Sequence, residues 1–169
     1  MPQAPDALPE CPCAATVATV GEWWSILILR DAMQGFTRFD QFQRSLGIAP
    51  NMLARRLKHL TEHGIFERRL YSPRPARYQY VLTGKGRDLF PVVAAMVAWG
   101  NRHLAREGAS LLLADRVSGR ILEPVLVDAE SGQPIDATTA RAVAGPQASP
   151  QMLQRLADIA ALNSRSSTE

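Results

Sequence analysis

The chain has 169 residues, which is room for one domain or for one domain with an appendage. With 46% hydrophobic and 21% charged residues, its composition is that of a folded protein and excludes intrinsic disorder. No apolar run approaches the roughly 18 residues of a membrane span, and the acidic, Pro-rich start does not read as a signal peptide. We therefore expect a cytoplasmic protein without a membrane partner. Two cysteines cannot form a disulfide scaffold.

The net charge of +3 is unevenly distributed. Residues 38–87 contain eleven Lys or Arg against three acids, an excess of eight positive charges. Residues 111–169 contain five Arg against seven acids. A compact basic block followed by a mildly acidic tail is typical of a polyanion-binding module with an accessory segment, although a solvated basic surface without a partner has the same composition.

The beginning of the chain predicts an arm and two helices. Residues 1–10 contain three prolines and are expected to form a mobile arm. Pro12 suits the first position of a short helix that ends before Gly21. Residues 22–34 are strongly apolar and predict a second helix, which Gly35 ends.

Two further helices are separated by a short link. Phe39, Phe42 and Leu46 fall at near-helical spacing and predict a short helix that ends at Gly47. Residues 50–63 predict a longer one. Two helices joined by such a link are the helix-turn-helix arrangement.

The helix predicted over residues 50–63 has two distinct faces. At about 100° per residue, its leucines form one stripe and three polar residues lie nearly opposite. The leucines are Leu53, Leu57 and Leu60, and the polar residues are Asn51, Arg55 and Lys58. Arg56 falls beside the apolar stripe, where it would reach a neighbouring helix or a phosphate. An ordinary amphipathic surface helix would show the same pattern.

A β-hairpin is predicted directly after this helix. Residues 65–71 and 78–82 alternate apolar and polar side chains, and the SPRPAR segment between them contains Pro73 and Pro75, which cannot continue a strand. Arg74 lies near the tip. A helix-turn-helix followed by an Arg-tipped hairpin is a winged helix, which can place a helix in the major groove and the wing along the backbone or minor groove.

A long helix follows the hairpin. Thr83 can cap it, and it is expected to run over residues 84–106 with a bend near Pro91. It is too apolar for one small domain to bury, so we expect it to pair with its copy in a second subunit. The predicted fold is mainly α with a small β wing: a winged helix-turn-helix with a long dimerisation helix and a C-terminal β-hairpin/helix appendage. We expect the winged domain over residues 11–107 and the tail over 108–169.

These segments together resemble the HxlR-type branch of the MarR-related bacterial transcription regulators. The resemblance rests on Cys11-Pro12, GEWWSILILRDAMQG, the run from TRFDQFQRSL to HGIFERRLY, YQYVLTGKGRDLFPV and Trp99-Gly100. It implies a homodimer that binds a palindromic operator in double-stranded DNA, as a repressor by expectation, and that responds to a small molecule, an electrophile or an oxidant. The alternative is a winged helix module that binds proteins without recognising an operator.

Matching positions assign roles to individual residues. The resemblance implies that Asn51, Met52, Arg55 and Lys58 face the groove. Arg56 and Lys85 would lie near the backbone. Many relatives have a hydroxyl residue where this chain has Ala49, which cannot cap the following helix. The full set of predicted DNA-binding residues is Arg38, Asn51, Met52, Arg55, Arg56, Lys58, Arg74, Arg77 and Lys85.

The cysteines are candidate redox sensors. Relatives frequently keep a cysteine at Cys11, and some use it to sense oxidants. A position just before a helix N-terminus would lower the pKa of the Cys11 thiol and favour the thiolate. The alternative is a packed, inert thiol near the dimer interface. Cys13 is too close to Cys11 for an unstrained disulfide, so we expect an intersubunit bridge or simple packing.

Other candidate sites have simpler alternatives. Five large apolar residues can line an effector pocket between the winged domain and the dimer helices, or can belong to the core: Trp23, Trp24, Phe90, Met96 and Trp99. His59 and His63 are four residues apart, but without a third ligand no metal site is predicted. No catalytic constellation, phosphate-binding loop or cofactor motif is found, so we expect no enzyme and no cofactor.

The tail contains a short repeat. Residues 113–122 and 126–135 share the pattern L-x-D-x-x-S-G at an offset of thirteen residues. Asp at the first position of a turn and Gly at a positive φ predict two tight, metal-free β-hairpins. A linker over residues 136–145 and a last helix that starts at Ser149-Pro150 are expected to follow.

Overall fold

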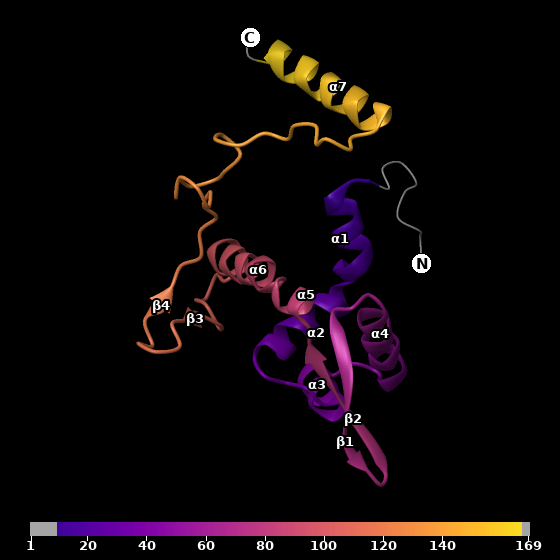
Figure 1. Cartoon of the computed structure of the whole chain (residues 1–169). Helices are drawn as coiled ribbons and strands as arrows, with labels where there is room; N and C mark the ends of the chain where they lie inside the picture. Colours follow the sequence, from indigo (N-terminus) through magenta and orange to yellow (C-terminus); the bar gives the residue numbers. More distant parts are fainter. Residues whose placement is uncertain (1–9, 167–169) are drawn as a thin grey trace. The chain divides into compact units, whose positions relative to one another are not determined.

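The computed structural model describes residues 10–166, with side-chain burial described to residue 163, so the predicted arm lies outside the described residues except for Glu10. The described chain is mainly helical with two small antiparallel sheets, as predicted (Figure 1). The helices are α1 Pro12–Val20, α2 Trp23–Met33, α3 Phe39–Leu46, α4 Pro50–Glu62, α5 Gly84–Arg87, α6 Phe90–His103 and α7 Pro150–Ser166. The strands are β1 Phe66–Pro73, β2 Ala76–Leu82, β3 Leu113–Ala114 and β4 Ile121–Leu122.

Contacts between residues divide the chain into two compact units. One comprises Thr19–Pro124. The other comprises, among the described residues, 125–166 together with 10–18. The boundary predicted after residue 107 stays a prediction, although by contacts the β3–β4 hairpin groups with the first unit.

The core of the first unit lies between α2, α3, α4 and the start of β1. The predicted leucine stripe of α4 is fully buried there. Phe42 of α3 is also fully buried, and its ring meets those of Phe36 and Phe66 edge-on at centroid distances of 6.4 Å. Because one face of α4 fills this core, its opposite face is left on the surface.

Local signals set the helix boundaries. Glu22 caps α2, because its Oε2 accepts a hydrogen bond from the N–H of Trp24 at 3.1 Å. Gly47 ends α3 with a φ of 61°, a conformation that favours glycine. Ala49 provides no capping side chain for α4, as expected. Pro50 occupies the first turn of α4, and because proline has no N–H, it leaves one fewer unpaired donor at the helix N-terminus.

The wing is a hairpin whose strands are longer than predicted. Phe66 pairs with Leu82, and the ladder continues until Pro73 pairs with Ala76. The prediction that Pro73 belongs to the turn is therefore wrong. A proline at the last position of a strand is tolerated because no ladder hydrogen bond is needed from its nitrogen there.

The wing is joined to the segment that precedes α3. The N–H of Tyr80 in β2 donates to the carbonyl oxygen of Thr37 at 2.6 Å. Arg38, the next residue, forms an antiparallel bridge with Gln79. We call this pairing of Thr37 and Arg38 with β2 the wing joint. It attaches the entry to α3 directly to the hairpin.

The single helix predicted over residues 84–106 is interrupted. α5 ends at Arg87 and α6 begins at Phe90. Pro91 explains the break, because it has no N–H to donate to the carbonyl of Arg87. Thr83 caps α5 as predicted, with its Oγ1 accepting from the N–H of Gly86 at 3.1 Å. Gly86 is packed so tightly that a Cβ there would lie 2.3 Å from the carbonyl oxygen of Ile65.

The first turn of the tail repeat has the predicted chemistry. Asp115 Oδ1 accepts from the N–H of Ser118 at 2.7 Å and from its hydroxyl at 2.8 Å. Gly119 has a φ of 71°. Hydrogen bonds from Ser118, its backbone N–H first, lower the pKa of Asp115. β3 and β4 pair on either side of this turn and complete the first predicted hairpin.

The second turn repeats the same contacts. Asp128 Oδ2 accepts from the N–H of Ser131 at 2.8 Å and from its hydroxyl at 2.7 Å, which lowers the pKa of Asp128. Gly132 has a φ of 68°. Beside this turn Val127 and Pro134 form an antiparallel bridge, and the N–H groups of Asp128 and Ile135 donate to the carbonyl oxygens of Gln133 and Leu126, both at 2.9 Å. The second predicted hairpin is therefore present as a short one.

The last helix begins where predicted and has two caps. The Ser149 hydroxyl oxygen accepts from the N–H of Met152 at 3.2 Å. Glu10 binds the same residue, since its Oε2 accepts from the Ser149 N–H at 3.2 Å and its Oε1 from the Ser149 hydroxyl at 2.5 Å. Glu10 thereby places a carboxylate at the N-terminus of α7.

Across residues 10–166, none of the helices taken singly combines the length and the apolar character that a membrane crossing requires. α1 and α2 meet both criteria when taken together, with a bend of 79° between them.

Candidate nucleic-acid interface

The outer face of α4 presents the three polar residues that the sequence placed there. Asn51, Arg55 and Lys58 are all exposed. Arg55 Nη2 lies 2.9 Å from the sulfur of Met52, and Lys58 Nζ lies 3.7 Å from Glu62 Oε1. Both are contacts at the surface of the same helix, worth little to stability, so these side chains can be redirected to a ligand at small cost.

Two other predicted contacts on α4 are placed differently. Met52 is half-buried and packs against the core. Arg56 is only 6% exposed, and its Nη1 lies 3.9 Å from Oε2 of Glu22, the residue that caps α2. Of the two alternatives for Arg56, the structure shows contact with a neighbouring helix. Arg56 is therefore not part of the exposed face of α4.

The wing carries exposed arginines, and one of them stacks on a tyrosine. Arg74 lies at the tip and Arg77 beside it, both exposed. The Arg68 guanidinium stacks on the ring of Tyr78, with its carbon 3.5 Å from the ring centroid. The sequence pattern did not single out Tyr78. The sequence signal that could have identified this contact is the recurrence of Arg and Tyr along both predicted strands.

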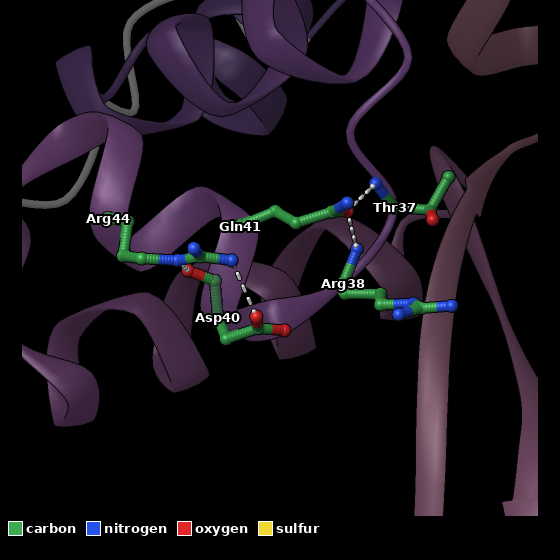
Figure 2. A network of polar contacts seen from close by, with 5 residues as sticks. All are labelled: Thr37, Arg38, Asp40, Gln41 and Arg44. Carbon is green, nitrogen blue, oxygen red and sulfur yellow. Dashed lines mark hydrogen bonds and ion pairs between the residues drawn. The ribbon is translucent and has the colours of Figure 1, made fainter.

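Arg38 connects α3 to the wing. It is exposed, occupies the N-cap position of α3 and places its guanidinium carbon 4.6 Å from the centroid of the Tyr71 ring. Figure 2 shows its backbone N–H beside the side chain of Gln41. Gln41 holds the backbone beneath it, since its Oε1 accepts from the N–H groups of Thr37 at 3.0 Å and of Arg38 at 2.9 Å. The side chain of Arg38 is thus presented from a fixed backbone.

Lys85 lies at the junction of α4 and α5. Its Nζ donates to the carbonyl oxygen of His63 at 2.9 Å, while the side chain remains exposed. The histidine pair His59 and His63, whose spacing alone would suit a metal, contacts backbone oxygens in the same way. His59 Nε2 lies 3.0 Å from the carbonyl oxygen of Thr19, and His63 Nδ1 lies 2.8 Å from that of His59.

Acids within the basic block neutralise few of its charges. Asp40 pairs with Arg44 at 2.9 Å, Glu62 pairs with Lys58, and Glu67 pairs with Arg69. The remaining exposed cations of the block have no acidic partner among the described residues, and a surface of this kind attracts polyanions. These cations are Arg38, Arg55, Arg68, Arg74, Arg77, Lys85 and Arg87.

α6 carries an exposed apolar stripe. Val92, Met96 and Trp99 are 45%, 51% and 56% exposed and share one face of the helix by their spacing. The Trp99 ring lies 5.1 Å from that of His103 on the same face. Val93 and Ala94, on another face, are buried. The exposed stripe is the kind of surface that a second copy covers.

The aromatic residues predicted to line an effector pocket lie on different surfaces. Trp23 is 62% exposed and stacks against Trp24 at a centroid distance of 4.0 Å. Met96 and Trp99 belong to the stripe on α6. Phe90 instead lines a cavity together with residues of α2 and β2.

The two cysteines lie at the start of α1. Cys11 is half-buried and Cys13 is exposed. Cys11 forms part of the wall of a cavity of about 610 Å³, together with Met152, Leu156 and Ile159 of α7.

Comparison with known proteins agrees with this architecture. Residues 19–108, more than half of the chain, match the model of the HxlR-like helix-turn-helix family. An uncharacterised HTH-type transcriptional regulator of Mycobacterium tuberculosis is 41% identical over 128 residues, covering 75% of this chain and 81% of that protein. One of Synechocystis is 36% identical over 104 residues, covering 61% and 77%.

Solved structures extend the likeness. A proposed transcription factor from Pseudomonas aeruginosa is 53% identical, covers 86% of this chain and 99% of its own, and superposes with a TM-score of 0.62. Since 86% of the chain exceeds the part that ends at Gly108, this likeness includes part of the tail. The redox regulator HypR in its reduced form is 32% identical, covers 57% and 99%, and has a TM-score of 0.52.

Proposed function

Because the chain belongs to the HxlR-like helix-turn-helix family of transcriptional regulators, we propose that it binds a palindromic operator in double-stranded DNA as a homodimer and represses transcription from it. The observation that carries the proposal is the division of α4. Its leucines are buried, while Asn51, Arg55 and Lys58 are exposed on the opposite face. A helix fixed from one side and polar on the other can enter the major groove.

The proposal divides the contacts by role. Arg55 and Asn51 have the chemistry to read guanine and adenine edges. Arg38, Arg74, Arg77 and other cations of the wing and its joint have the chemistry to hold phosphates, which would provide most of the affinity. A second copy bound through the α6 stripe would present a second α4 one helical turn away, at a half-site spacing of about 10 bp.

Replacement of Arg55 by alanine tests the assignment of base reading. We expect Arg55→Ala to weaken binding to the native promoter fragment by about 1–3 kcal/mol, roughly fivefold to 150-fold, and to change binding to random DNA little. Arg74→Ala is the matched variant: it should weaken binding to both DNAs by similar factors, because a phosphate contact carries no sequence information. Fluorescence anisotropy at fixed salt measures both.

The same measurement distinguishes the alternative function. Equal losses for both variants on both DNAs would contradict the assigned roles. Absence of any preference for the promoter fragment, with weak binding that salt abolishes, would instead favour a protein-interaction module.

Cys11 and Cys13 are proposed to make operator binding redox-sensitive. The exposure of Cys13 and the likeness to the redox regulator HypR support this. We expect diamide to change the operator affinity of the reduced protein severalfold, and reductant to restore it. The Cys11→Ser/Cys13→Ser variant should not respond, and a wild-type protein whose operator affinity ignores diamide would refute the redox part of the proposal.

A further inference from the structure

A cavity of about 400 Å³ lies at the root of the wing, within the unit Thr19–Pro124. The end of α2, the link to α3, β2, the α5–α6 segment and the turn between β3 and β4 all contribute to its wall. Its volume falls in the range of small-molecule sites. Most lining side chains are apolar, among them Met33, Phe36 and Phe90.

Two arginines from separate elements also line this cavity. Arg87 belongs to α5, and its Nη1 donates to the carbonyl oxygen of Leu82 at 2.7 Å, which fixes the guanidinium at the wall. Arg116 belongs to the first tail turn. Neither forms an ion pair with an acid among residues 10–163. The cavity therefore combines an apolar interior with an uncompensated positive charge.

Hydrogen bonds of the first tail turn restrict the backbone conformation at Arg116. Asp115 binds the N–H groups of Val117 and Ser118, so the residue between Asp115 and Val117 is held in a closed turn. The second turn has the same contacts but carries Ala129 at the position that corresponds to Arg116. The turn itself therefore does not require an arginine.

We propose that this cavity binds a small organic carboxylate. Its apolar body would pack against Met33, Phe36 and Phe90, and its carboxylate would pair with Arg87 and Arg116. A carboxylate on an apolar body fits better than inorganic phosphate, because the apolar walls offer phosphate oxygens few hydrogen-bond donors.

The same cavity touches the wing joint. Thr37 and Tyr80 both line it, and they are the two residues joined by the 2.6 Å hydrogen bond between the entry to α3 and β2. A ligand here contacts both sides of the wing joint, which connects Arg38 to the wing of the proposed DNA surface. The wing joint sets the position of the wing relative to α3. A ligand that binds one arrangement of this joint more tightly than another therefore changes the affinity of the protein for DNA. By linkage, bound DNA changes the affinity for the ligand by the same factor. This link rests on the proposed DNA-binding function, whereas the site does not.

Titration calorimetry of the full chain with 2-naphthoate tests the site. We expect 2-naphthoate to bind at least tenfold more tightly than the neutral 2-naphthamide, because only the carboxylate can pair with the arginines. Arg116→Ala should weaken 2-naphthoate binding about tenfold. Arg120→Ala, on the same hairpin but outside the cavity wall, should leave it unchanged. Equal binding of the two probes, no binding of 2-naphthoate, or an unchanged affinity in Arg116→Ala would overturn the site.

A second titration tests the link to DNA. Saturating 2-naphthoate should change the affinity for the promoter fragment at least threefold in the wild type, and not in Arg116→Ala. If 2-naphthoate binds but the DNA affinity is unchanged, the proposed carboxylate site stands and the proposed coupling between the site and DNA is wrong. A chain that binds no DNA at all would refute the proposed function and the link, while the calorimetry would still decide the site.

Discussion

Replacement of Arg56 by alanine is expected to lower the free energy of unfolding by about 3 kcal/mol. The guanidinium is buried against Glu22, and its removal leaves that carboxylate, whose side chain is 21% exposed, without its cation. The buried stem of the arginine is lost at the same time. The loss should lie at the lower end of the range for broken buried pairs, because the Glu22 side chain is partly exposed and the closest atoms of the pair are 3.9 Å apart. Urea denaturation measures the change.

Arg55→Ala is the matched control for this prediction. It is the same substitution at the adjacent position of α4, but on the exposed face, so it should change stability by less than about 0.5 kcal/mol. Glu22→Gln gives an independent check, since it removes the charge but can keep the cap of α2. It should destabilise by less than Arg56→Ala. An Arg56→Ala protein of full stability that has lost DNA affinity would place Arg56 at the DNA.

Replacement of Trp99 by glutamate is expected to raise the dissociation constant of the proposed homodimer about a hundredfold. Trp99 lies in the exposed stripe of α6, and a buried aromatic at the centre of an interface contributes about 2–4 kcal/mol. In a two-fold interface the substitution also introduces two like charges. Sedimentation velocity over a range of concentrations measures the constant.

Val117→Glu serves as the control for that experiment. Val117 is 96% exposed and lies on the first tail turn, so the same charge there should leave the oligomeric state unchanged. A Trp99→Glu protein that remains as tightly dimeric as the wild type would exclude the α6 stripe as the interface. The wild type found monomeric at micromolar concentration would exclude the homodimer itself.

The sequence predicted those parts of the fold that depend on local periodicity and capping. The leucine stripe of α4, the cap at Thr83 and the Asp-x-x-Ser-Gly turns follow from residues within a few positions of one another. The same holds for the exposure of Asn51 and Arg55, since a helix with one buried face exposes the other.

Features that depend on packing between distant segments were not predictable in this way. The helical wheel places Arg56 beside the apolar stripe, but its partner Glu22 is set by how α2 lies against α4. The break before α6 depends on Pro91 and on the contact of Gly86 with Ile65. The cavity at the wing root gathers Met33, Tyr80 and Arg116 from three elements, and no spacing in the sequence brings them together.

The bond between Glu10 and Ser149 has a consequence for the order in which the protein folds during synthesis. The two residues are 139 positions apart, so α7 acquires its carboxylate cap only after all the residues between them have been synthesised. The unit Thr19–Pro124 contains its own core and can complete it while the tail is still being translated. The unit that combines residues 10–18 with residues 125–166 therefore forms after the unit Thr19–Pro124.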